Sequence, residues 1–120
     1  MAKGDDILKR LVSFSGEIVD LCKHLPTTAA SKHISAQLLR SGTAGAPNYA
    51  EARAAESCVD FIHKLGVTLK ELNETQTWLL LIQDQQMVPD EAILPLVKEC
   101  DELCRIMAVS RRTARERIKK

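Results

Sequence analysis

The sequence predicts an all-α protein, specifically an antiparallel up-down-up-down bundle of four helices in a single domain. Aromatic residues are only 3% of the 120 residues, and five glycines and four prolines leave few helix breakers. Apolar residues recur at three- and four-residue spacing along most of the chain. Short polar or proline-containing segments separate four such stretches, and short connections place successive helices side by side in opposite directions.

The first helix is expected at residues 5–24. Asp5 or Asp6 can cap its start, and the residue before Pro26 is disfavoured in the α region, which ends it. The apolar stripe of this helix consists of Ile7, Leu11, Phe14, Ile18, Leu21 and Leu25.

The second helix, expected at residues 28–55, contains a conflict. Gly42, Gly45 and Pro47 together cost about 5 kcal/mol of helix propensity relative to alanine. They favour a break, followed by a helix that restarts with Thr43 as its cap and Pro47 in its first turn. The competing interpretation is one long helix that is kinked near Pro47.

The third helix, at residues 57–84, has the clearest pattern. Its apolar residues follow a near 3.5-residue repeat, typical of the seam of a bundle. The seam consists of Cys58, Ile62, Leu65, Leu69, Leu72 and Leu79. Trp78 and Leu81 fall outside it and predict a second contact, which we interpret as a subunit interface.

The fourth helix is expected at residues 90–112, where Asp90 and Glu91 favour the positive end of the helix dipole. Beyond Ser110 the apolar spacing lapses until Ile118, so the last ten residues, a basic tail at 111–120, are expected to be disordered.

The tail concentrates the positive charge of the chain. Residues 105–120 hold seven basic residues against one acid, a net charge of +6, whereas residues 1–104 hold ten basic and fifteen acidic residues, a net charge of −5. This asymmetry is typical of a nucleic-acid contact, a membrane-surface contact, or a tail that pairs with the acidic body of a neighbouring subunit. The candidate nucleic-acid-binding residues are Arg105, Arg111, Arg112, Arg115, Arg117, Lys119 and Lys120.

No motif for catalysis, a cofactor or a metal is evident, and we expect a protein that is not an enzyme. Cys100 and Cys104 could hold two corners of a zinc site, but their place on an apolar stripe favours buried thiols. The start of the chain does not resemble a signal peptide, so reduced thiols and a cytoplasmic location are expected. No apolar stretch approaches the roughly 20 residues of a membrane span.

One polar group stands out on the second helix. If that helix is continuous, Arg40, Asn48 and Glu51 lie on one side of it, and Ser41 lies beside them. The group is either an inter-helix polar network that fixes packing or a site for a ligand or RNA.

The segment from Gln37 to Ser57, followed by Asp60 to Gly66 and Glu99 to Leu103, resembles the bacterial four-helix bundle proteins encoded by intervening sequences of 23S ribosomal RNA genes. Their signature corresponds here to Arg40, Ser41, Asn48, Glu51 and Ala52. The resemblance implies a long, continuous second helix, and we adopt it. Relatives that serve as accessory proteins of diversity-generating retroelements form five-fold barrels and bind nucleic acid and a reverse transcriptase. By that analogy we expect a ring-shaped homopentamer.

Two functions follow from these observations. The first is an oligomeric protein that binds RNA or another nucleic acid through the basic tail. The second is a protein-interaction scaffold without nucleic-acid binding, in which the tail serves assembly.

Overall fold

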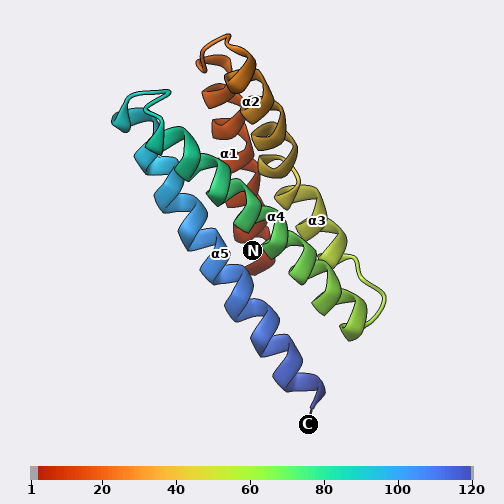
Figure 1. The fold of residues 1–120 in the computed structure, drawn as a ribbon. Coiled ribbons are helices and arrows are strands. Elements are labelled where there is room, and N and C mark those ends of the chain that lie inside the picture. Colours follow the sequence, from red (N-terminus) through yellow and green to blue (C-terminus); the bar gives the residue numbers. More distant parts are fainter. Residues whose placement is uncertain (1–2, 120) are drawn as a thin grey trace.

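The structure, a computed structural model, describes residues 3–119 (Figure 1). Its helices are α1 (Lys3–Lys23), α2 (Ala29–Gly42), α3 (Gly45–Arg53), α4 (Cys58–Asp84) and α5 (Asp90–Ile118). No strand occurs among residues 3–119, and the all-α prediction is therefore confirmed. Within the same residues, no helix has both the length and the apolar character that crossing a bilayer requires.

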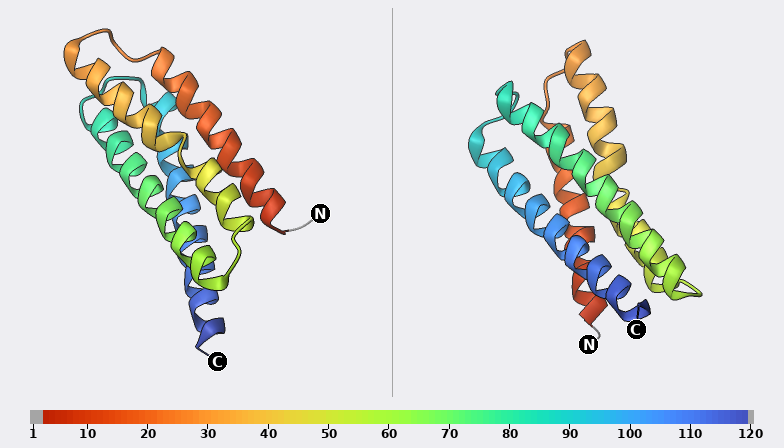
Figure 2. Two further views of the ribbon diagram at one scale, coloured as in Figure 1. Left: turned by 90° about the vertical axis from the view of Figure 1, so that its right-hand side faces the viewer. Right: turned by 60° about the horizontal axis from the view of Figure 1, so that its bottom comes forward.

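The helices pack as an elongated bundle of 51 × 26 × 20 Å. The central helix is α4, which lies against α5 on one side and against α2 and α3 on the other. The first helix, α1, packs against α2, α3 and α5. The last turns of α5 extend beyond the start of α4 (Figure 1 and the left view of Figure 2), so this end of the bundle presents a protruding helix.

Apolar side chains from all of these helices form one core. Leu65, Leu72 and Leu79 of α4 are almost fully buried, as the seam predicts, whereas Cys58 is exposed because it is the first residue of α4 and lies at the end of the helix. The other fully buried apolar residues of the core include Leu11, Phe14, Ile18, Leu38, Ile82, Ile93, Cys100, Leu103 and Met107.

The prediction of one long second helix is wrong. The helix ends at Gly42, and a new helix begins at Gly45 with Pro47 in its first turn. Proline has no N–H group, so the Thr43 carbonyl loses the partner that a continuous helix would supply. The neighbouring Gly42 carbonyl accepts a hydrogen bond from another helix, since Ser15 of α1 donates its hydroxyl hydrogen to it at 2.9 Å.

The prediction of a disordered tail is also wrong for the residues that the structure describes. The last helix continues through residues 111–118, and Lys120 lies outside the described residues. Arg111 and Ala114 are half-buried on the face that carries Met107. The apolar stem of an arginine can cover core residues while its charged head stays near water, so a count of apolar residues alone misses this packing.

Candidate nucleic-acid interface

The exposed basic residues at the end of α5 occupy two sides of the helix. At 100° per residue, Arg112, Arg115 and Lys119 fall within one sector, and Arg117 projects from nearly the opposite side. Among residues 3–119, none of these four side chains forms an ion pair with a carboxylate. Their positive charge is therefore available to an anionic partner.

Two other predicted contact residues have different surroundings. The guanidinium of Arg105 pairs with Asp101 at 2.9 Å, one turn earlier on the same helix. Arg111 points toward α4, where its guanidinium lies beside Gly66 and its Nε is buried without a hydrogen-bond partner. The free basic residues are thus Arg112, Arg115, Arg117 and Lys119, which we call the basic end of α5.

The polar residues of the family signature do not form one network. Arg40 of α2 is exposed, and its guanidinium pairs with two carboxylates of α4, with Glu71 at 3.1 Å and with Glu74. These contacts raise the pKa of Arg40 and lower the pKa of Glu74, whose carboxylate also accepts a hydrogen bond from Trp78 Nε1 at 3.2 Å. Because its charge is already paired, Arg40 is a link between helices in this structure.

The remaining signature residues each have a separate partner. Ser41 is fully buried, and its Oγ lies 2.9 Å from Thr75 Oγ1 of α4. Asn48 donates from Nδ2 to the Ala44 carbonyl, so it helps to hold the start of α3. Glu51 pairs with Lys64 of α4 at 3.2 Å. Of the two interpretations of these residues, the structure favours packing contacts over a ligand site. The contacts are separate pairs and do not form a connected network.

A pocket of about 290 Å³ opens beside the basic end of α5. The helices α1, α3, α4 and α5 meet there, and the lining consists of Gly4, Ile7, Tyr49, Phe61, Val109, Ser110, Thr113, Ala114 and Arg117. Tyr49 is only 5% exposed, and burial raises the pKa of its phenol, an effect that the nearby Arg53 opposes. The pocket combines two aromatic rings with hydroxyl groups and one guanidinium, and we call it the end pocket.

Two ion pairs connect helices that contribute to the pocket. Arg10 of α1 binds Glu99 of α5 through both Nε and Nη2, at 3.1 and 2.6 Å. Arg53 of α3 binds Asp5 of α1 at 2.7 Å. Neither pair was predicted, because nothing in the spacing of the sequence links residues that lie so far apart in the chain.

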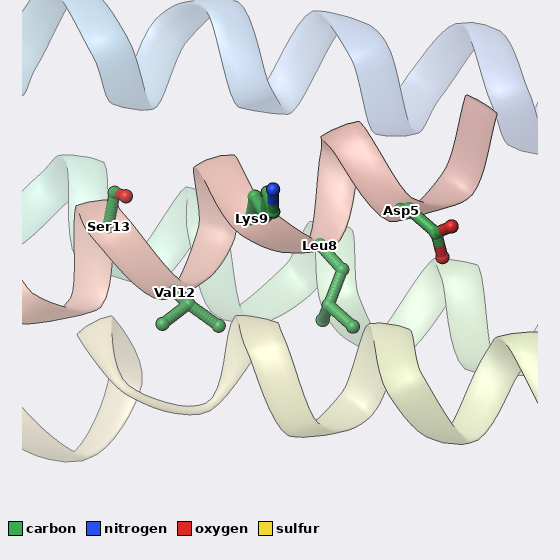
Figure 3. A pocket seen from close by; sticks show the side chains of 5 residues that line it. All are labelled: Asp5, Leu8, Lys9, Val12 and Ser13. Carbon is green, nitrogen blue, oxygen red and sulfur yellow. The ribbon is translucent and has the colours of Figure 1, made fainter. Parts of the chain in front are cut away.

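A second, more apolar groove of about 530 Å³ lies along α1 and is lined by Asp5, Leu8, Lys9, Val12 and Ser13. Figure 3 shows Leu8 and Val12 extending from successive turns of α1 toward α2 and α3. Val12 is 56% exposed. The groove therefore offers apolar surface with a charged rim.

Trp78 lies half-buried within the subunit. Its ring meets the ring of His33 edge-on, with ring centroids 6.0 Å apart. Leu80 and Leu81 on the next turn remain exposed. Of the two residues predicted to form a subunit contact, Leu81 is therefore exposed and Trp78 is half-buried.

The cysteines are free thiols, and Cys100 is fully buried. The adjacent Cys104 sulfur and burial raise the pKa of the Cys100 thiol, which donates to the Leu72 carbonyl at 3.3 Å. Within residues 3–119, no group of three or more His, Cys, Asp or Glu side chains is placed to hold a metal ion.

These features define a class: an all-α bundle protein with a basic, protruding helix end. Residues 4–109 match the family model described as 23S rRNA-intervening sequence protein, and the chain belongs to this family. A crystal structure of a protein of unknown function from the S23 ribosomal protein family of Bacteroides thetaiotaomicron is similar, with 32% identity and a TM-score of 0.84 over 92% of this chain and 99% of that chain. No curated protein matches the sequence.

Proposed function

We propose that this chain is a non-enzymatic, cytoplasmic protein that binds structured RNA through the basic end of α5. The observation that supports the proposal is the free charge of Arg112, Arg115, Arg117 and Lys119 on a helix end that extends beyond the bundle. Basic side chains that contact phosphates release counterions from the nucleic acid, and this release supplies much of the binding free energy.

The charge of the rest of the chain limits the RNA contact to this end. Residues 1–104 carry a net charge of −5 and repel a polyanion, whereas the protruding end attracts it. The match to the family model stops at residue 109, before the basic end begins. The proposal therefore depends on the charge and position of these residues in this chain.

We further propose that the antiparallel bundle assembles into a ring-shaped homo-oligomer, with a pentamer favoured by analogy. The exposed apolar residues Val12, Leu80 and Leu81 provide surface for such contacts. A ring would present several basic ends to one RNA, and simultaneous contacts raise the apparent affinity without any new interaction.

A protein-interaction scaffold is the second candidate. The groove along α1 supports it, because exposed Val12 and half-buried Leu8 present apolar surface that the subunit covers only in part (Figure 3). In this case the basic end would contact acidic residues of a neighbouring subunit or partner.

The test measures RNA affinity by fluorescence anisotropy with a labelled hairpin of structured ribosomal RNA at two salt concentrations. The variant carries Arg112→Gln, Arg115→Gln, Arg117→Gln and Lys119→Gln. Truncation after residue 104 is unsuitable, because it removes the fully buried Met107 from the core. The control variant removes the same charge from exposed lysines elsewhere, at Lys9, Lys23, Lys32 and Lys98.

We expect affinity that falls steeply with salt, is lost in the first variant and is retained in the control. Equal losses in both variants would mean that net charge alone matters and would contradict an interface at the basic end. If the unaltered protein does not bind the RNA at micromolar concentration, the RNA-binding proposal is contradicted and the protein-interaction scaffold is favoured.

A further inference from the structure

We infer that the end pocket receives one unpaired nucleobase of a bound RNA, while Arg117 at the pocket contacts an adjacent phosphate. This inference rests on the proposed function and adds a preference for RNA with a bulged or single-stranded nucleotide. It follows from the chemistry of the groups that meet in the pocket.

The pocket contains hydroxyl groups without partners. Tyr49 is nine-tenths buried, lines the pocket, and makes no side-chain hydrogen bond to any residue between 3 and 119. The same holds for the hydroxyls of Ser110 and Thr113, within the part of the chain that the structure describes. None of these three hydroxyl oxygens is fully buried, so each is accessible from the pocket and can pair with a ligand that supplies a donor or an acceptor.

The unpartnered hydroxyl of Thr113 differs from the hydroxyls of other threonines in the helices. The hydroxyls of Thr68, Thr75 and Thr77 each donate to the carbonyl four residues earlier, at 2.8 to 3.1 Å. Thr113 lies in a helix as well, but its hydroxyl makes no such bond within the described residues. Its hydrogen-bonding capacity remains available to the pocket.

The shape and the remaining groups favour a flat, polar-edged ligand. A volume of about 290 Å³ is far larger than the roughly 30 Å³ of a water molecule and lies at the small end of the range for ligand sites. The half-buried ring of Phe61 offers a surface on which a base can stack, whereas the ring of Tyr49 is almost covered. Hydroxyl groups both donate and accept, so they can pair with the edge of a nucleobase.

The position of the pocket links it to the phosphates. Arg117 lines the pocket and is the residue of the basic end that projects on this side of α5, whereas Arg112, Arg115 and Lys119 project from the other side. A strand with one phosphate at Arg117 would bring an adjacent unstacked base to the pocket mouth. A base that is held in a duplex could not enter without the cost of unpairing.

The experiment compares two RNA hairpins that differ only in one nucleotide, which is bulged in one and paired in the other. The variants are Tyr49→Phe, which removes only an unpartnered hydroxyl, and Phe61→Leu, which removes the ring and keeps an apolar side chain. The control is Val109→Ala at the same pocket, which changes neither a ring nor a hydroxyl. Thermal unfolding followed by circular dichroism verifies that each variant folds.

We expect the unaltered protein to bind the bulged hairpin roughly tenfold more tightly than the paired one. Both pocket variants should lose most of this preference and keep the affinity for the paired hairpin, whereas the control should keep both. Equal affinity for the two hairpins, or a preference that survives both variants, would overturn the inference that the pocket binds a base. Neither result would contradict phosphate binding by the basic end. Loss of all binding in the four-residue glutamine variant tests the proposed function separately.

Discussion

Arg111 of α5 lies directly against Gly66 of α4. A Cβ atom placed on Gly66 would be 3.0 Å from each of three guanidinium atoms of Arg111, namely Nε, Cζ and Nη2. This contact joins the last turns of α5 to α4 and so supports the basic end. The contact is possible because glycine has no side chain.

The first prediction concerns this contact. Gly66→Ala gains about 1 kcal/mol of helix propensity, but its methyl group must displace the Arg111 guanidinium. We therefore expect the free energy of unfolding to change by less than about 1 kcal/mol, since the two effects oppose each other. In the Arg111→Ala background, Gly66→Ala should raise the free energy of unfolding by the full gain in helix propensity, about 1 kcal/mol. Urea unfolding measures both, and an equal effect of Gly66→Ala in the two backgrounds would show that the contact is absent.

The second prediction contrasts two other helical glycines. A Cβ atom on Gly42 would lie 2.7 Å from Cγ2 of Ile18, which is fully buried and cannot move aside easily. Gly42→Ala should destabilise by about 1 to 3 kcal/mol through overpacking. Gly16 has no atom within 4 Å of such a Cβ, so Gly16→Ala should stabilise by about 0.5 to 1 kcal/mol. Thermal unfolding of both variants checks the opposite signs.

The helices were largely predictable from periodicity, and the errors have physical causes. The propensity of Gly42, Gly45 and Pro47 correctly indicated a break, and the resemblance to relatives, which we preferred, led to the wrong long helix. The end of α5 was missed because Arg111 was counted as polar, although it packs in a half-buried position.

The candidate site was only partly predictable. The sequence identified the basic residues but could not show that Arg105 and Arg40 are paired with carboxylates. The end pocket was missed because its lining comes from four helices, from Gly4 to Arg117. The only available signal was Tyr49 among the small residues of the second predicted helix, and that signal alone does not indicate a pocket.

The third prediction tests the buried hydroxyl pair of Ser41 and Thr75. The Thr75 hydroxyl also lies 2.8 Å from the Glu71 carbonyl, so it keeps a partner when Ser41 is replaced. Ser41→Ala should cost about 1 kcal/mol or less. Thr75→Val should cost about 1 to 2 kcal/mol, because Ser41 would retain only a long contact of 3.5 Å to the Leu38 carbonyl. A double-mutant cycle by urea unfolding should give a coupling of about 0.5 to 1.5 kcal/mol, and additive effects would rule out the pair.

The fourth prediction ranks two thiols by reactivity. The thiolate is the reactive form, and Cys100 is fully buried with a raised pKa, whereas Cys58 is exposed. Iodoacetamide at pH 8 should modify Cys58 first and Cys100 only after unfolding. Mass spectrometry of digested samples, with and without urea, measures the order. Rapid modification of Cys100 in the native protein would mean that α4 and α5 separate readily.

The fifth prediction concerns acid stability through Glu74. Hydrogen bonds from Arg40 and Trp78 lower the pKa of this carboxyl from its ordinary value of 4.5. The folded state therefore prefers the ionised form, so this contribution to stability is present above pH 4.5 and is lost as the pH falls through the lower folded value. Arg40→Gln should lower the melting temperature at pH 7, and the difference from the unaltered protein should shrink as the pH falls below 4.5. In the Glu74→Gln background, the pH-dependent part of the Arg40→Gln effect should decrease, because one of the two carboxylates that bind Arg40 no longer titrates. If the Arg40→Gln difference were the same at pH 7 and pH 3, the Arg40 contacts would not depend on ionised carboxylates.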